Sequence, residues 1–459
     1  MVVQHNMQAA NANRMLNVTT SAQSKSTEKL SSGYRINRAA DDAAGLTISE
    51  KMRKQIRGLD QASTNAEDGV SSVQTAEGAL TEVHSMLQRM NELATQAANG
   101  TNSKDSDRQA IQDEIDQLTT EIDRVSETTK FNETYLLKGD KGATKNVYMN
   151  GHDAGLKGTL TDSAKSATFV MDELKAGDKV TIAGKEYSIG STADEAKASY
   201  ANAAAGDKVT IDGTEYTVVD AATGTEDADN NELKVTSLDG KVKDGSVVSY
   251  KTSKLTVMTD KNNDGVDDDD SSVISKDVAE GKILSELTAA NNIGTVDQAA
   301  TVAKAAANGK TTYTITKGYA TVADTLSFNL HVGADADMTN KINVSIDSMD
   351  SASLGIKGLN IKDDSGNAAT YAVDAISDAI SKVSSQRSSL GAVQNRLEHT
   401  INNLDNVVEN TTTAESRIRD TDMASEMVNY SKNNILAQAG QSMLAQANQS
   451  TQGVLSLLQ

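Results

Sequence analysis

The sequence predicts an α+β protein: long N- and C-terminal helices form a coiled-coil rod, and a β-rich variable domain is inserted between them. Near both ends, apolar residues recur at alternating steps of three and four, which is the period of a coiled coil. Between about residues 140 and 370 the period is instead that of alternating strands. Proline is absent from all 459 residues, so the helices carry none of the kinks that proline imposes.

One apolar seam near each end carries the helical period. Because 3,4 spacing places one residue per turn on a single line, each seam needs a partner: the other end of the chain, another copy, or both. We expect helices at about 47–98, 104–128 and 374–412. The N-terminal seam is Val73, Ala76, Leu80, Val83, Leu87, Met90, Ala94 and Ala97, and the C-terminal seam is Ile376, Ile380, Val383, Leu390, Leu397, Ile401, Leu404 and Val408.

Segments 1–45 and 415–459 have few apolar residues on a background of Ala, Asn, Gln and Ser. Such segments bury too little apolar surface on their own to offset the entropy lost on ordering. We expect them to be disordered in the monomer and to fold on assembly. In the C-terminal segment a thin stripe follows the helical period: Leu436, Ala439, Met443, Ala447, Val454 and Leu458.

The insert contains a local duplication. Residues 174–190 recur as 203–219 at an offset of 29 residues, and each copy reads as strand, glycine-containing turn, strand. This pattern predicts two hairpins. Two copies are too few for a solenoid. Further strands are expected at 247–258, 312–316, 326–332 and 341–347.

Composition limits the partners and the chemistry. A formal charge of −20 makes nucleic acid and anionic membrane poor partners. Without a run of 18 apolar residues no membrane span is expected, and the N-terminus lacks the pattern of a cleaved signal peptide. The absence of cysteine excludes disulfides and thiolate sites.

One acidic loop resembles the start of a calcium loop. Asp260, Asn262 and Asp264 stand at positions 1, 3 and 5, and Gly265 stands at position 6, as an oxygen-ligand site requires. Position 12 is Ser271 instead of glutamate, and no helix is expected directly after it. We therefore favour a solvated acidic loop over a calcium site.

No other motif predicts catalysis. The five histidines are scattered, without the spacing of a metal site, and neither a phosphate loop nor a nucleophile elbow is present. We therefore expect neither a cofactor nor an enzymatic activity.

Ordered motifs at both ends closely resemble those of bacterial flagellins, over about 140 residues at the start and about 90 at the end. The N-terminal motifs are SSGYRIN (31–37), ADDAAGL (40–46), LQRMNELA (87–94) and EIDRV (121–125). The C-terminal motifs are SLGAVQNRL (389–397), AG (439–440), LAQAN (444–448) and VLSLL (454–458).

The resemblance implies three regions. Residues 1–45 with 415–459 would form the inner filament tube, 46–140 with 325–414 the coiled-coil core with a β-hairpin, and 141–324 the surface-exposed variable domain. The hairpin, formed by residues 330–335 with 342–349, departs from the family pattern. Flagellins usually carry it directly after the N-terminal helices, whereas here it follows the insert.

The implied function is that of a structural subunit that self-assembles head-to-tail into the flagellar filament for motility, because a heterologous contact extends without closing. The protein would be extracellular, exported by the flagellar secretion apparatus, with an export chaperone, the filament cap and hook-associated proteins as partners. The candidate assembly residues are Leu436, Met443, Val454, Leu455 and Leu458.

The resemblance also implies that the chain is a ligand of the flagellin-sensing Toll-like receptor of a host. The matching positions are Arg89, Glu92, Leu93, Gln96 and Glu114. For Arg89 and Glu114 the alternative is an exposed coiled-coil flank or a subunit interface.

Two other functions fit parts of the sequence. A hook–filament junction protein has similar ends but usually lacks this full set of motifs. A secreted enzyme or adhesin could reside in the insert, although no metal or nucleophile constellation supports an enzyme. Ser- and Thr-rich stretches there would also accept O-linked sugars.

Overall fold

The computed structural model describes residues 6–101, 103, 106–363 and 365–457. The chain divides into two compact units, of which the first comprises Met1–Ser71, Phe328–Val344 and Ala392–Gln459. The second comprises Ser72–Ser327 and Ser345–Gly391. These units differ from the three regions expected from the sequence, which stay a prediction. Among the described residues, no helix has the length and apolarity needed to cross a membrane.

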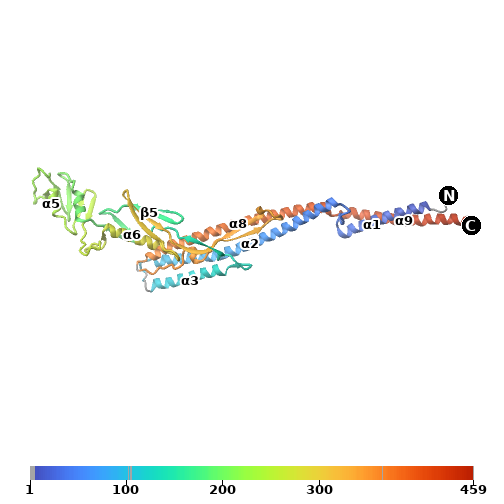
Figure 1. The fold of residues 1–459 in the computed structure, drawn as a ribbon, viewed down its shortest axis with the longest axis horizontal. Helices are drawn as coiled ribbons and strands as arrows, with labels where there is room; N and C mark the ends of the chain where they lie inside the picture. Colours follow the sequence, from blue (N-terminus) through green and yellow to red (C-terminus); the bar gives the residue numbers. More distant parts are fainter. Residues whose placement is uncertain (1–5, 102, 104–105, 364, 458–459) are drawn as a thin grey trace. The chain divides into compact units, whose positions relative to one another are not determined.

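In the first unit, helices from the two chain ends lie side by side: α1 (Met7–Ser32) and α9 (Met423–Leu457) (Figure 1). The Asn6 side chain accepts a hydrogen bond from the Ala9 N–H at 2.9 Å and so caps α1, as N-cap residues do. The helix ends at Gly33, whose φ of 74° is left-handed, a conformation that glycine adopts without a steric penalty. Disorder of these segments in the monomer stays a prediction.

Two longer helices, α2 (Ala43–Ala97) and α8 (Asn367–Arg419), carry the predicted seams. All eight residues of the N-terminal seam are at most 1% exposed, and those of the C-terminal seam are buried or half-buried. In the second unit the Glu77 carboxylate of α2 binds the Arg387 guanidinium of α8 at 2.7 Å. Both helices begin earlier than predicted because carboxylates cap them: Asp42 accepts from the Gly45 N–H, and Asp363 from the Asn367 N–H.

A third helix, α3 (Asp107–Thr128), is held by two buried polar residues. Arg108 is 1% exposed and donates to the carbonyls of Ala97 and Asp363 at 2.9 and 2.6 Å. Gln112 donates to the Leu359 carbonyl and accepts from the Ile361 N–H. These bonds tie α3 to the end of α2 and to the segment that precedes α8.

The predicted hairpin after the insert is confirmed: β17 (Leu326–His331) pairs with β18 (Lys341–Ile346), and the short helix η1 (Met338–Asn340) lies in the connection. Within the first unit the hairpin contributes Leu330, Val332 and Ile342 to a core with residues of α2 and α8. In the second unit, α7 (Ser351–Leu354) follows the hairpin and precedes α8.

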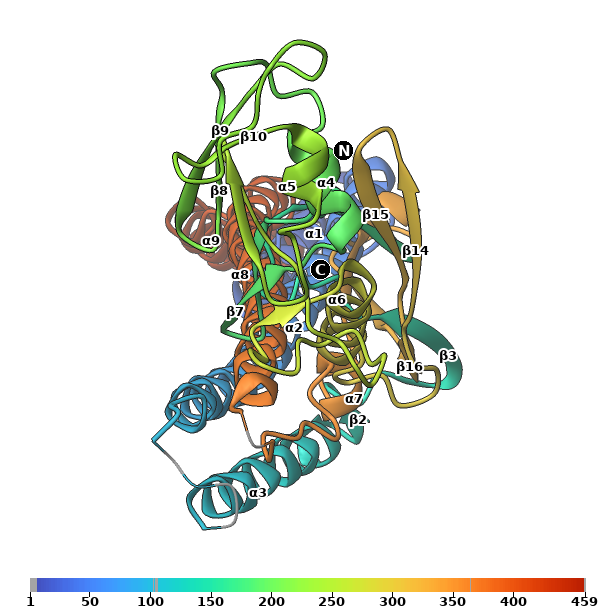
Figure 2. The ribbon, with the colours of Figure 1, turned by 90° about the vertical axis from the view of Figure 1, so that its left-hand side faces the viewer.

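The outer part of the insert is an antiparallel sheet covered by α6 (Lys276–Asn291) (Figure 2). Its strand order is β14-β15-β5-β4, and a separate pair, β3 and β16, joins the insert to the helices. Phe169, Tyr313 and Ile283 lie in the core between sheet and helix. The strand bounds are β3 (Asp140–Tyr148), β4 (Thr159–Asp162), β5 (Ser166–Asp172), β14 (Thr301–Ala307), β15 (Lys310–Thr316) and β16 (Tyr319–Asp324), with a small pair β1 (Lys130–Phe131) and β2 (Thr134–Tyr135) directly after α3.

Both predicted repeat hairpins are present: β6 (Lys179–Ile182) with β7 (Lys185–Ile189), and β8 (Lys208–Ile211) with β9 (Thr214–Val218). Both turn residues of each hairpin have positive φ, Ala183–Gly184 in one and Asp212–Gly213 in the other, as a type I′ turn requires. The repeat extends to ion pairs at equal positions, Lys179–Glu186 at 2.7 Å and Lys208–Glu215 at 2.6 Å.

The structural repeat is longer than the sequence repeat. A short third strand pairs in parallel with the second strand of each hairpin, at equivalent register: β13 (Val273–Ile274) with β7 and β10 (Glu232–Leu233) with β9. An aspartate before each third strand, Asp267 or Asp227, accepts hydrogen bonds from the N–H groups two and three residues onward. A helix follows each third strand, α6 in one copy and α5 (Val235–Asp239) in the other.

One copy is therefore nested inside the other. The inner copy lies between β7 and β13, where it adds α4 (Ala193–Tyr200), β11 (Val247–Tyr250) and β12 (Ser253–Thr256). The chain segments that lead into and out of the inner copy are adjacent. The Ser191 N–H donates to the Thr256 carbonyl at 2.8 Å, and the Met258 N–H donates to the Ser191 carbonyl at 3.0 Å. Its buried core lies within 196–257, separate from the core under α6.

His152 joins the start of the insert to α8. Its backbone exchanges two hydrogen bonds of 2.9 Å with the Asn291 side chain, and its Nε2 lies 3.3 Å from Asp378 Oδ2. Burial would lower the pKa of His152, but the hydrogen bond to Asp378 and the charges of Asp378, Asp374 and Asp153 outweigh burial and raise the pKa above 6.5.

The first prediction concerns the inner copy. Removing residues 192–256 and joining Ser191 to Val257 through a short glycine linker should leave the helices and the core under α6 (the outer core) folded. The two cores are separate, and the joined ends already lie side by side. Circular dichroism should show an unchanged melting temperature for the helical signal. Removing the outer hairpin 174–190 is the control and should lower it, since Ile182 and Ile189 belong to the outer core. An equal loss in both deletions would contradict the nesting.

The second prediction concerns pH. A histidine whose folded-state pKa is raised stabilises the fold fully below its unfolded pKa of 6.5, and this stability is lost as pH rises through the folded pKa. We therefore expect the melting temperature of wild type relative to His152→Gln to fall as pH rises above 6.5. Differential scanning calorimetry of both proteins measures this difference in melting temperature. The contributions of the other histidines are the same in both proteins and cancel. A difference that is constant with pH would show that His152 does not titrate in this ion pair.

Candidate assembly surface

The pairing of α1 with α9 leaves an apolar groove of about 710 Å³ along the two helices. The helices approach closely at Gly440, where an added Cβ would lie 3.4 Å from Leu16 Cδ1. Small residues allow such contact but bury little area. Among the α9 side chains that the structure describes, Ala437 alone is buried. The groove is lined by Met15, Leu16, Leu436, Ala439, Gly440 and Met443, together with polar residues.

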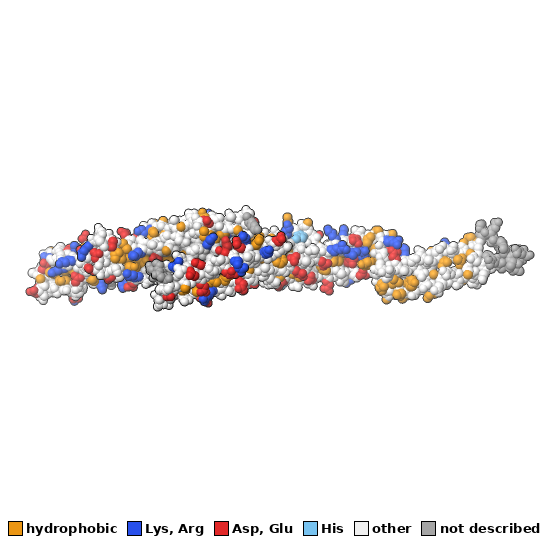
Figure 3. Space-filling view, turned by 90° about the horizontal axis from the view of Figure 1, so that it is seen from below, with side chains coloured by type: hydrophobic (Ala, Val, Ile, Leu, Met, Phe, Trp, Pro, Cys, Tyr) orange, Lys and Arg blue, Asp and Glu red, His pale blue; other side chains and the backbone are white. Residues whose placement is uncertain are grey.

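Large apolar side chains remain exposed around this groove. Leu436 is 47% exposed and Met443 is 60% exposed, so the structure places both predicted assembly residues on the surface. In Figure 3 orange side chains gather over the α1–α9 pair. Exposed apolar clusters of this kind mark contact surfaces. Met15, which also lines the groove, is 56% exposed. The same two helices expose Val18, Met427, Val428 and Ile435.

The other three predicted assembly residues lie near the C-terminal end of the chain. Val454 and Leu455 lie within α9, but their side chains are outside the described part of the structure. Leu458 lies outside the described residues.

A set of contacts at the base of the pair joins the two chain ends, and sequence reasoning did not find it. The Arg35 N–H donates to the Arg419 carbonyl at 2.6 Å, and the Thr421 N–H to the Gly33 carbonyl at 2.9 Å. The Arg419 guanidinium lies 4.8 Å from the centre of the Tyr34 ring and 2.8 Å from Glu50 Oε1. The SSGYRIN motif therefore supplies the turn, the ring, one backbone donor (the Arg35 N–H) and one backbone acceptor (the Gly33 carbonyl) of this tie.

The five predicted receptor positions fall on α2 and α3. Arg89 is exposed, and its guanidinium binds Glu114 at 2.9 Å and Glu92 at 3.2 Å. The hydrogen bond to Glu114, followed by that to Glu92, raises the pKa of Arg89 above its ordinary value. Gln96 and Glu92 line an open hollow on the same face of α2.

Leu93 is buried, unlike the four other positions of this set. It is 2% exposed, because it lies three residues after Met90, on the side of α2 that faces the core. Its side chain is not part of the exposed surface, and its contact with a receptor stays a prediction.

In the acidic loop, the side chains accept hydrogen bonds from backbone N–H groups of the same loop. Asp260 accepts hydrogen bonds from the N–H groups of Asp264 and Gly265, and Asp264 accepts from the Val266 N–H. Asn262 accepts from the Asp264 N–H. Contrary to expectation, a helix does follow the loop: α6 begins at Lys276, capped by Ser275. Within the described residues no group of three or more metal-ligating side chains is arranged around a common point. Calcium binding stays the weaker of the two interpretations, after a solvated acidic loop.

Comparison with known proteins assigns the family. The family description "Bacterial flagellin N-terminal helical region" matches residues 3–142, and "Bacterial flagellin C-terminal helical region" matches residues 373–458. A flagellin of Clostridium tyrobutyricum is 41% identical over 462 residues, covering 98% of this chain and all of that protein. The chain belongs to the bacterial flagellins.

Another relative agrees: a flagellin of Bacillus subtilis (strain 168) is 36% identical and covers both chains completely. Among solved structures, FliC of Burkholderia pseudomallei (19% identity, 72% of this chain and 99% of that one) has a TM-score of 0.27. Hook-associated protein 3 of Legionella pneumophila (15% identity, 80% and 98%) has a TM-score of 0.34. Both scores are too low to carry an argument, so the assignment depends on the sequence relatives.

Membership confirms the main predictions from sequence. Flagellin is the structural subunit of the flagellar filament, exported outside the cell and used for motility, and full-length flagellin relatives favour this function over a hook–filament junction protein. The family is that of a structural protein. The α+β fold with long terminal helices around a β-rich insert is confirmed as well.

Proposed function

We propose that this flagellin assembles head-to-tail through the apolar groove between α1 and α9. The observation that carries the proposal is the exposure of Leu436 and Met443 beside the groove, at 47% and 60%. Side chains of this size stabilise a contact by about 1.5–3 kcal/mol each when fully buried. A neighbouring subunit that covers the groove would supply the burial that the α1–α9 pair lacks alone.

We extend the proposal to the partners that the resemblance implies. The chain would leave the cell through the flagellar secretion apparatus without a cleaved signal peptide, accompanied by an export chaperone, and would meet the filament cap and hook-associated proteins. The weak burial along α1 and α9 supports this route, because a pair with so few buried side chains unfolds at little cost.

The third prediction tests the groove. Leu436→Asp and Met443→Asp should each slow seeded polymerisation by at least about tenfold, because each places a charge where apolar area would be buried. The helical circular dichroism of the monomer should not change, since both side chains are already exposed. Met338→Asp is the matched control: Met338 is 74% exposed but lies in the hairpin connection.

Negative-stain electron microscopy of seeded reactions gives the readout, with a chain lacking residues 420–459 as the non-assembling reference. Filaments of wild-type length from both groove variants would refute the proposal. So would a defect in Met338→Asp as large as that in the groove variants.

We also propose that the face formed by Arg89, Glu92, Gln96 and Glu114 binds the flagellin-sensing Toll-like receptor. Its support is the match of these positions to the family motif, together with their exposure. The ion pairs fix the Arg89 guanidinium, so less side-chain entropy is lost when a partner binds it.

The fourth prediction tests this face. Arg89→Ala should weaken receptor binding by about tenfold or more, in the range expected for an arginine at the centre of an interface. Its melting temperature should match wild type because the side chain is exposed. The control is Arg124→Ala, which removes another exposed arginine of the α2–α3 region, paired with Glu121 at 2.5 Å. Surface plasmon resonance with the receptor ectodomain measures both. Equal binding by wild type and Arg89→Ala would exclude the proposed contact.

A further inference from the structure

A donor-rich cleft of about 440 Å³ lies in the second unit, where β3, the end of the hairpin, α7 and α8 meet. Its α8 wall is formed by residues at helical spacing: Lys382, Ser385, Gln386 and Ser389. The opposite wall carries Lys145 of β3 and Asp347, which directly follows β18. None of these residues belongs to the assembly surface or to the Arg89 face.

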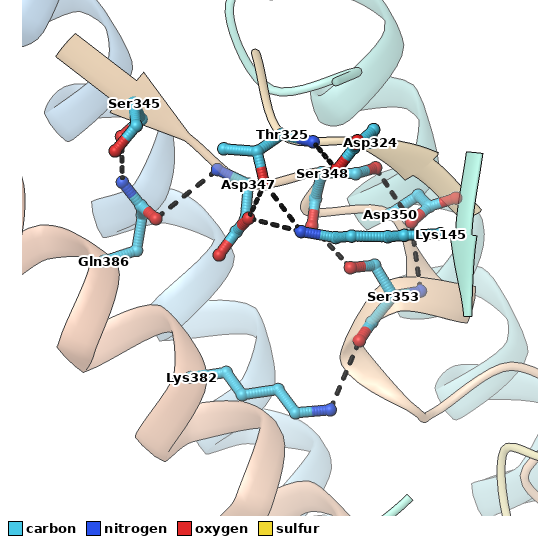
Figure 4. Close-up of polar contacts among 10 residues, drawn as sticks. All are labelled: Lys145, Asp324, Thr325, Ser345, Asp347, Ser348, Asp350, Ser353, Lys382 and Gln386. Carbon is cyan, nitrogen blue, oxygen red and sulfur yellow. Dashed lines mark hydrogen bonds and ion pairs between the residues drawn. The ribbon is translucent and has the colours of Figure 1, made fainter. Parts of the chain in front are cut away.

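The Asp347 carboxylate of the cleft is paired with a lysine. Lys145 Nζ donates to Asp347 Oδ1 at 2.6 Å and to Thr325 Oγ1 at 2.7 Å (Figure 4). Burial would raise the pKa of Asp347, but the hydrogen bonds from Lys145 and Thr325 outweigh burial and lower it. Lys145 and Asp347 therefore form an ion pair without net charge, and one of the three Lys145 N–H groups is unused.

Lys382 has no such partner. Its Nζ donates to the Ser353 carbonyl at 3.3 Å, and within the described chain no carboxylate lies within the 4.0 Å of an ion pair. Burial lowers the pKa of Lys382, and Lys317 acts in the same direction, whereas Asp378, one turn earlier on α8, raises it. Asp378 is occupied by His152, and Lys317 by Asp162. The cleft thus holds a largely buried ammonium group bonded to a single neutral oxygen.

Of the other polar side chains on the α8 wall, Gln386 is occupied and the two serines are available as donors. Gln386 donates to the Ser345 carbonyl and accepts from the Asp347 N–H. In the described structure the hydroxyls of Ser385 and Ser389 have no protein partner, and both line the cleft. Figure 4 shows Lys145 and Lys382 reaching from opposite walls toward the space beside Ser353.

We propose that this cleft binds a small oxyanion of the phosphate class between the ammonium groups of Lys382 and Lys145. The anion accepts hydrogen bonds from Lys382, from the unused Lys145 N–H and from the hydroxyls of Ser385 and Ser389. Such charge-assisted bonds are the strong ones, and they balance the charge that Lys382 leaves uncompensated. Because the cleft joins strand, hairpin, α7 and α8, a bound anion stabilises the junction between the helices and the insert.

The test is isothermal titration calorimetry of the full-length monomer with inorganic phosphate, in chloride buffer of matched ionic strength, with light scattering to verify that no filaments form. We expect saturable binding at one site, and a rise in melting temperature with phosphate, as linkage requires. Lys382→Met should weaken binding at least about tenfold, while Lys382→Arg retains it. Lys357→Met is the matched control, since it removes an exposed lysine close to α7.

A second readout separates binding from folding. In chloride alone, Lys382→Met should melt at the same temperature as wild type or higher, because it removes a buried charge without a counter-ion, and phosphate should no longer raise that temperature. Absence of saturable phosphate binding by wild type would overturn the proposal. So would equal binding by Lys382→Met, or an equal loss in Lys357→Met.

Discussion

The structure depends on the side-by-side packing of helices from opposite ends of one chain. Along α2 and α8, seam residues such as Leu80 and Leu390 are fully buried, and this apolar contact gives the helices their stability. Along α1 and α9 the same arrangement has smaller side chains and leaves the large ones exposed. The apolar contact is therefore complete between α2 and α8 and incomplete between α1 and α9, and this difference is the basis of the proposal that a neighbouring subunit covers the second pair.

Sequence reasoning succeeded where a feature is periodic or local. The seams follow from 3,4 spacing, and the two repeat hairpins from alternation around Ala183–Gly184 and Asp212–Gly213. The start of α8 was placed too late because it is set by the Asp363 side chain, a capping interaction that leaves little trace in the apolar pattern. Helix α6 was missed because its buried face, with Ile283 and Leu287, is matched to a sheet whose strands come from both earlier and later in the chain.

Features that combine distant segments were beyond the sequence. The tie around Arg35 and Arg419 combines backbone hydrogen bonds with side-chain contacts between residues far apart in the sequence, so no local pattern of residue types indicates it. Burial of Leu93 depends on the rotation of α2 about its axis, and the motif that suggested a receptor contact contains both faces of the helix. The donor-rich cleft draws Lys145 and Lys382 from opposite sides of the insert, and each alone resembles an ordinary surface lysine.

The bridge between Ser191 and Val257 has a consequence for the order of folding. In an unfolded chain β7 and β13 are separated by on the order of 80 residues, and closing such a loop costs entropy that grows with the logarithm of its length. Once the inner copy has folded, its adjacent ends at Ser191 and Val257 shorten that separation to on the order of 20 residues. The loop that joins β7 to β13 in the sheet of β6, β7 and β13 is then much shorter, and the lower sequence separation of this pairing favours its faster formation. Nesting therefore lets the inner copy fold first and so bring β7 and β13 together.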